Sequence, residues 1–133
     1  MSSSSFSSSV ADWVRRTKQT MEDVVHLSSE RLAEAVVAGT PEPNGALAAS
    51  FQASGSSMPV MRAAVSTGDG FDAGAFSQAI LGIPFGGSIY MGFTAPYAAK
   101  VEYGVNSRNG YGMVRLAAQR WPDIVEQAAT ETK

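Results

Sequence analysis

Apolar side chains recur at spacings of three and four along the first third of the chain, which predicts a long amphipathic helix. The stripe comprises Val10, Trp13, Val14, Thr17, Met21, Val24, Val25, Leu32, Ala35 and Val36, with one polar gap around Ser28. Ser8 or Ser9 is a candidate N-cap, and Gly39 followed by Pro41 is a stop signal. A helix of about thirty residues would be roughly 45 Å long. We therefore expect part of its face to meet something outside the monomer.

The first eight residues read as a separate leader. Residues 1–8 are serine-rich and have little to bury, so we expect them to be mobile. They lack the basic and apolar regions of a secretory signal. The remaining residues 9–133 are enough for one domain with one modest core.

The middle of the chain contains three strand candidates. They are residues 48–54, 75–83 and 88–94, which combine alternation with aromatic or β-branched side chains. Residues 39–45 carry two prolines and an Asn-Gly pair, which is turn chemistry. Residues 55–73 show no period and predict a long loop, which we expect to order on assembly.

The C-terminal segment is periodic again and predicts a second amphipathic helix over residues 113–130. Its stripe is Met113, Leu116, Ala117, Arg120, Trp121, Ile124, Val125 and Ala128. Pro122 removes an intrahelical hydrogen bond, so it should kink or interrupt this helix. The pattern leaves open whether Trp121 packs in the core or at an interface. The predicted class is α+β: a long N-terminal helix, a small antiparallel sheet, a short helix and a C-terminal helix.

Composition excludes several classes of function. Charged residues make up 17% of the chain, below the usual level of about 25%, and the net charge is −2. The chain thus lacks the overall positive charge that is typical of proteins that bind nucleic acid. Cysteine is absent, which excludes disulfides, thiolate metal sites and cysteine nucleophiles. No apolar run approaches the length of a membrane span.

Catalytic chemistry has few candidates. His26 is the only histidine, and no further metal ligand follows it at a recognisable spacing. Asp69 and Asp72 are close in the predicted loop, but nothing marks a pocket that would separate their pKa values. No phosphate-binding glycine motif or nucleophile elbow is present. We therefore expect no enzyme, no cofactor and no metal site.

The stretch "TAPYAAKVEYG", residues 94–104, gathers tyrosine, lysine and glutamate. Pro96 can open a helical turn and Gly104 can end it. Helical spacing then puts Tyr97, Lys100 and Val101 on one face and Ala99, Glu102 and Tyr103 on another. Two interpretations stay open. Either the tyrosines pack locally while Glu102 caps or pairs nearby, or Tyr97, Glu102 and Tyr103 form a subunit interface, where tyrosine is enriched.

The block "APYAAKVEYG", followed by a loop and the helix "MVRLAAQRWPDIVEQA", resembles the neck or tail-completion proteins of long-tailed bacteriophages. These are small head–tail joining proteins, often labelled minor tail component. The family's turn often reads Pro-Val-Asp-Thr-Gly-x-Leu-x-x-Ser. Here "PEPNGALAAS" retains Pro41, Gly45, Leu47 and Ser50 but replaces the Val-Asp-Thr core. The resemblance covers roughly residues 10–130.

The resemblance implies a structural virion protein made in the host cytoplasm and located at the neck. Such proteins form a ring, generally a hexamer, between the head-side connector or head-closure protein and the tail terminator or tail tube protein. DNA passes through the lumen without sequence-specific binding, and no catalysis, cofactor or membrane is implied. A ring of this kind requires heterologous interfaces that close.

Three rival functions stay open. A tail terminator that caps the tail tube is the nearest and has a related α+β architecture. A small hydrolase or phage-encoded enzyme would have to use Asp69, Asp72 or Glu102. A non-viral, non-catalytic binding module is the third.

Overall fold

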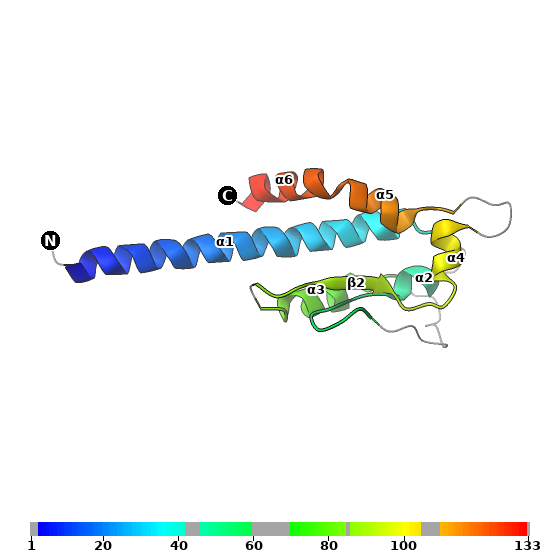
Figure 1. Cartoon of the computed structure of the whole chain (residues 1–133), viewed down its shortest axis with the longest axis horizontal. Coiled ribbons are helices and arrows are strands. Elements are labelled where there is room, and N and C mark those ends of the chain that lie inside the picture. The colour runs from blue at the N-terminus through cyan, green and yellow to red at the C-terminus, as the bar shows by residue number, and fades with distance from the viewer. Residues whose placement is uncertain (1–2, 42–45, 60–69, 85, 105–109, 133) are drawn as a thin grey trace.

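A single long helix, α1 (Ser3–Ala38), is the spine of the molecule. The computed structural model describes residues 3–41, 46–59, 70–84, 86–104 and 110–132. Figure 1 shows the N-terminal part of α1 projecting alone, with all other elements gathered around its C-terminal half. Its 36 residues correspond to about 54 Å at 1.5 Å per residue.

The predicted N-terminal helix is confirmed, but its start is not. The helix begins at Ser3, so Ser8 and Ser9 lie inside it and the expectation that one of them is the N-cap is wrong. The mobility expected for residues 1–8 stays a prediction. The helix ends where expected, and Gly39 donates its N–H to the carbonyl of Ala35 at 3.1 Å.

Two consecutive helices, α5 (Met113–Gln119) and α6 (Trp121–Thr132), lie along one side of the C-terminal half of α1 (Figure 1). The predicted interruption is confirmed, because the helix breaks at Arg120. Pro122 lies in the first turn of α6, where its missing N–H costs nothing. Arg31 of α1 and Glu131 of α6 form an ion pair between the two layers, with Nη2 and Oε1 2.8 Å apart.

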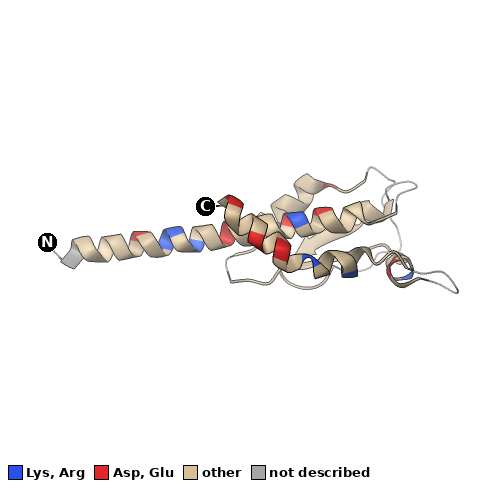
Figure 2. Ribbon diagram, turned by 90° about the horizontal axis from the view of Figure 1, so that it is seen from above, with Lys and Arg blue, Asp and Glu red and all other residues tan. Residues whose placement is uncertain are grey.

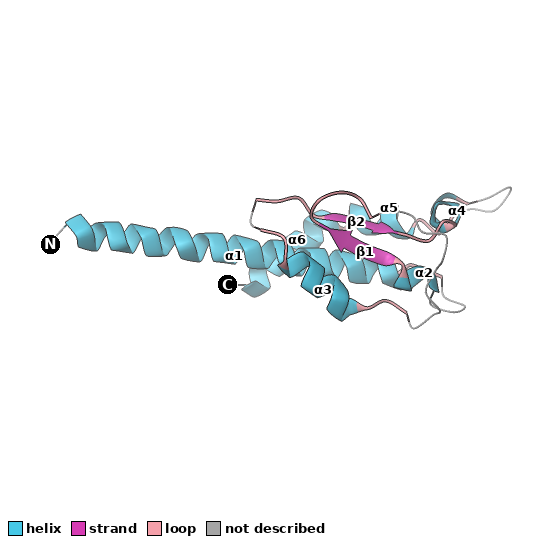
Figure 3. Ribbon diagram, turned by 90° about the horizontal axis from the view of Figure 1, so that it is seen from below, coloured by secondary structure: helices cyan, strands magenta, loops and turns pink. Residues whose placement is uncertain are grey.

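A two-stranded antiparallel sheet occupies the other side of α1 (Figure 3). Strand β1 (Phe51–Ser54) pairs with β2 (Tyr90–Phe93), with Phe51 opposite Phe93. The predicted strand 88–94 is therefore confirmed in its central part. The candidate 48–54 is a strand only from Phe51, because the preceding residues form a short helix, α2 (Ala46–Ala49).

The prediction of a strand over residues 75–83 is wrong. This segment forms most of a helix, α3 (Ala73–Leu81), whose N-cap Asp72 accepts the N–H of Ala75 at 3.0 Å. Phe76 and Ile80 are both buried, at the i, i+4 spacing of one helix face, and Ile83, just beyond the helix, is also buried. Apolar residues stand at both odd and even positions of this segment, so alternation could not distinguish a strand from a helix.

The core lies where the sheet, α1, α3, α5 and a further short helix, α4 (Ala98–Tyr103), meet. It contains Ala33 and Val36 of α1 together with Leu47, Phe51, Phe76, Ile80, Ala95, Ala98, Met113 and Ala117. The ring of Phe51 lies 4.8 Å from that of Phe93 and 5.7 Å from that of Phe76, centroid to centroid. Helices segregated around this small sheet make the fold α+β, as predicted.

The structure describes the predicted turn and the predicted loop only in part. Residues 42–45 of the predicted turn and 60–69 of the predicted loop lie outside the described residues.

Trp121 is 37% exposed, which does not fit a fully packed core residue. Among the described helices, none has both the length and the apolarity needed to cross a membrane.

The burial of α3 leads to a matched test. Ile80 is 0% exposed whereas its neighbour Leu81 is 62% exposed. Ile80→Ala should lower the free energy of unfolding by about 2–5 kcal/mol, because it removes buried methyl groups and leaves a cavity. Leu81→Ala should change it by less than about 1 kcal/mol. Urea unfolding followed by circular dichroism measures both, and equal losses would contradict this placement of α3.

Candidate interaction surface

A buried carboxylate joins helix α4 (Ala98–Tyr103) to the start of α5. Oε1 of Glu102 accepts the N–H of Val114 at 2.8 Å, and Oε2 accepts the N–H of Arg115 at 3.1 Å and its Nε at 2.8 Å. The N-cap of α5 is Gly112, which has no side chain to cap with. Glu102 thus satisfies two free N–H groups at the start of α5 from another helix, where the helix dipole also favours a negative charge.

The backbone of Glu102 strengthens the same junction. Its carbonyl accepts the N–H of Gly112 at 3.1 Å and Nη2 of Arg115 at 2.8 Å. The N–H of Tyr111 is donated to the carbonyl of Val101 at 2.8 Å. Gly110 packs so tightly against the carbonyl of Glu102 that a Cβ atom has no room there. We call this set of contacts the Glu102 clamp.

The contacts of the Glu102 clamp determine the direction in which the pKa of the Glu102 carboxylate shifts. Burial alone raises the pKa of Glu102, since it penalises the charged form. The hydrogen bonds from Val114 and Arg115, together with the positive charge of Arg115, outweigh burial and lower the pKa below its ordinary value. Glu102 is therefore a structural anion rather than a proton donor.

The stretch 94–104 is a helical turn, with one correction. Ala98 donates its N–H to Ala95 at 3.1 Å, so Pro96 lies in a turn before α4 instead of at its first position. Gly104 ends the helix as predicted, with φ of 90° and its N–H bonded to Lys100 at 2.9 Å.

The three interface candidates are placed differently. Glu102 is buried and engaged within its own chain, which confirms that it caps and pairs locally. Tyr103 is 67% exposed, and its ring lies 4.7 Å below the guanidinium of Arg115. Tyr97 is also exposed. A subunit-interface role for Tyr97, Glu102 and Tyr103 stays a prediction. Sequence reasoning missed Arg115, the partner of Glu102 and Tyr103.

Among the described residues, the catalytic candidates do not lie together in one site. Asp72 caps α3 and lines a cavity of about 470 Å³ beside β1, whereas Glu102 belongs to the clamp between α4 and α5. Asp69 lies outside the described residues. His26 is half-buried on α1, and within the described part of the chain no three metal-ligating side chains come together.

The projecting part of α1, which we call the α1 extension (residues 5–21), exposes a stripe of apolar side chains. Its stripe consists of Phe6, Val10, Trp13, Val14 and Met21 and continues to Val25, all of them exposed. Phe6 is 70% exposed and Trp13 62%. Interfaces are enriched in aromatic residues of this kind, and contiguous apolar patches on monomers are usually small. The α1 extension is therefore a candidate assembly surface.

Basic residues border the stripe of the α1 extension. Three of the four charged residues between Ser3 and Met21 are Lys or Arg (Figure 2). Thr17 lies in the stripe, so Arg16 and Lys18 are each about 100° round the helix on either side of it. Neither takes part in an ion pair within the described chain, whereas Arg15 is paired with Asp12.

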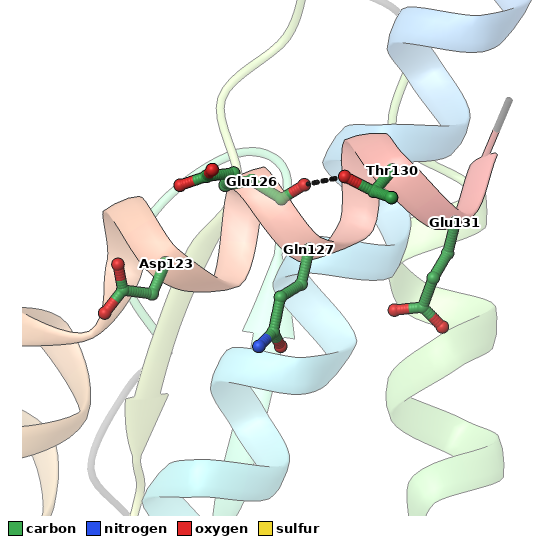
Figure 4. Close-up of a pocket in the computed structure, with 5 residues that line it drawn as sticks. All are labelled: Asp123, Glu126, Gln127, Thr130 and Glu131. Carbon is green, nitrogen blue, oxygen red and sulfur yellow. Dashed lines mark hydrogen bonds between the residues drawn. The ribbon is translucent and has the colours of Figure 1, made fainter.

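The exposed face of α6 has the opposite charge. The helix carries three acidic residues and no Lys or Arg. Asp123, Glu126, Gln127, Thr130 and Glu131 line a shallow open depression of about 450 Å³ (Figure 4). Glu131 is engaged by Arg31, but Asp123 and Glu126 have no ion pair among the residues that the structure describes.

An apolar groove of about 300 Å³ lies between α1, α5 and β2. Its lining is Leu32, Val36, Phe51, Met58, Ile89, Tyr90, Met91, Val114 and Ala118. A smaller groove of about 210 Å³ shares Ile89 and leads toward Val25 and Glu22 on α1. The two grooves therefore follow α1 from the body toward the α1 extension.

Comparison of the chain with protein-family models, with curated proteins and with solved structures gives no significant match. The likeness to phage neck proteins accordingly rests on the sequence blocks alone.

The depressed pKa of Glu102 predicts a pH-dependent contribution to stability. Its ionised form stabilises the fold fully above the unfolded-state pKa of about 4.3, and this stabilisation is lost as pH falls through the lower folded-state pKa. At pH 7, Glu102→Gln should lower the free energy of unfolding by about 1–3 kcal/mol. Denaturant unfolding across pH should show this difference shrinking below about pH 4. A difference that is constant with pH would contradict the clamp.

Gly110 offers a second test of the Glu102 clamp. Gly110→Ala should destabilise the protein by more than about 1 kcal/mol, because the added methyl group collides with the backbone at Glu102. Gly74→Ala is the control, because among the described residues an added methyl group there meets only Oδ1 of Asp72, at 3.5 Å, an ordinary contact distance. Thermal unfolding should rank Gly110→Ala as the more damaging change. The reverse order would show that the clamp tolerates repacking.

Proposed function

We propose that this chain is a structural protein of the phage neck that assembles into a ring joining the head connector to the tail. The observation that carries the proposal is the α1 extension, a helix of several turns with an apolar stripe that its own described chain leaves uncovered. A helix of this kind gains most of its stability from packing its apolar face. A subunit of a ring needs apolar surface that becomes buried only when the subunits assemble, and the α1 extension offers such a surface.

Two further observations support the proposal. The "APYAAKVEYG" block that carries the resemblance contains Glu102, the residue that fixes α4 against α5, so the most family-like segment is an architectural one. The charged residues of the α1 extension are mainly basic, whereas those of α6 are all acidic, which suits a heterologous contact between identical subunits. In a neck ring, DNA would pass through the lumen, and the neighbours would be the head-side connector and the tail terminator or tail tube protein.

The tail terminator is the second candidate, since it would use the same self-assembling architecture. Position in the particle separates the two. A hydrolase is less well supported, because Asp72 and Glu102 both have structural roles. A non-viral binding module would leave the resemblance without explanation.

The proposal predicts that the protein is a component of mature virions, located at the head–tail junction. Mass spectrometry of purified particles of the phage that encodes it should detect the chain in a few copies per particle. Immunogold electron microscopy should label the neck rather than the tail tube or the capsid. Absence from purified particles would refute the proposal, and label at the tail side of the junction alone would favour the terminator.

A further inference from the structure

We infer that the α1 extension of one subunit binds the apolar groove and the acidic α6 face of a second copy of this chain. The inference rests on the self-assembly in the proposed function and names the two surfaces that meet. Trp13 is the anchor of the contact. Arg16 and Lys18 lie against Asp123 and Glu126 of the neighbouring copy.

The apolar parts of the two surfaces match in kind. The stripe offers Phe6, Val10, Trp13 and Val14, which the described chain leaves exposed. The groove is lined almost wholly by apolar side chains, among them Ile89, Met91, Val114 and Ala118. Seating the stripe in the groove would cover apolar surface on both partners, and such burial is the main driving force for association.

The charged parts match as well. Arg16 and Lys18 flank the stripe, and neither is paired within the described chain. The groove is bounded by α5 at Val114 and Ala118, and α6, which follows directly, carries the unpaired Asp123 and Glu126. A helix seated beside α5 therefore meets a neighbouring acidic helix with its basic flank. Complementary charges of this kind set the partner and the orientation of an interface.

Pairing of two α1 extensions with each other is disfavoured by the same charges. An antiparallel pair centred on the midpoint of the stripe from Phe6 to Val25 would place Arg15 opposite Arg16 and Arg16 opposite Arg15. Both are like-charge pairs, which oppose association. The contact is therefore heterologous: the extension of each subunit binds the body of the next, and repetition of such a contact closes a ring or extends a filament.

Disulfide trapping tests the pairing. Because the chain contains no native cysteine, only the introduced cysteines can form disulfides. Chains with Val10→Cys, Val14→Cys or Met21→Cys are each mixed with full-length chains that carry Ala118→Cys, under mild oxidation. At least one mixture should give a heterodimeric disulfide, because a disulfide requires Cα atoms within about 7 Å. Gln19→Cys is the matched control, since Gln19 lies about 200° from Thr17 on the same helix. Predominant homodimers of the stripe variants, or no heterodimer, would overturn the inference.

Association strength is the second arm of the test. Sedimentation velocity of Trp13→Ala should show self-association roughly 30-fold weaker, the change expected for loss of an interface anchor. Its monomer should unfold at an unchanged temperature, because Trp13 is exposed. Asp123→Lys with Glu126→Lys should weaken association, and adding Arg16→Glu with Lys18→Glu in the same chain should restore it. Lack of rescue would overturn the charge pairing.

The two proposals fail separately. If the unmodified protein forms rings and is found in virions while the trapping and rescue experiments fail, the neck function stands and this interface is wrong. If the trapped contact forms but virions lack the protein, self-association stands and the neck function is wrong.

Discussion

The structure depends on one helix that is longer than the body that packs against it. The C-terminal half of α1 contacts α3 on one side and α5 and α6 on the other, and Ala33 and Val36 are buried there. The N-terminal half carries an apolar stripe of the same kind without any described cover. Because burial of apolar surface contributes about 25 cal/mol per Å², an exposed stripe of this length is a source of association energy.

The Glu102 clamp determines how the body closes around α1. It fixes the start of α5 to the end of α4 with backbone and side-chain hydrogen bonds, and α5 then leads into α6 along α1. A buried carboxylate costs desolvation energy unless hydrogen bonds compensate, and here Val114 and Arg115 supply them. The clamp therefore positions the groove wall formed by Val114 and Ala118, which is the body's part of the proposed contact.

Local signals predicted much of this fold from the sequence. The spacing of apolar side chains, followed by Gly39 and Pro41, predicted where α1 ends. Aromatic and β-branched residues predicted β2, and Pro122 predicted the break before α6. Residues 75–83 were misassigned because an apolar helix with side chains on both alternating faces resembles a buried strand. The fold class was nevertheless predictable, since the remaining elements already made it α+β.

The candidate surface was harder to predict, for two physical reasons. Glu102 and Arg115 are 13 positions apart, on separate helices, so no spacing rule connects them. A stripe that packs inside the chain and a stripe that packs on a neighbour also have the same period, so Trp13 and Val36 look alike in sequence and differ only in the structure. The excess length of the helix was the one sign that part of it would meet something outside the monomer.

Amide hydrogen exchange at two protein concentrations tests the central claim most directly. If the α1 extension is an assembly surface, amides of residues 6–21 should be weakly protected in dilute protein and strongly protected at concentrations where the chain associates. Amides of residues 28–38 should be protected in both, because the body already covers them. Equal protection of residues 6–21 at both concentrations, with association confirmed in the same samples, would contradict the account.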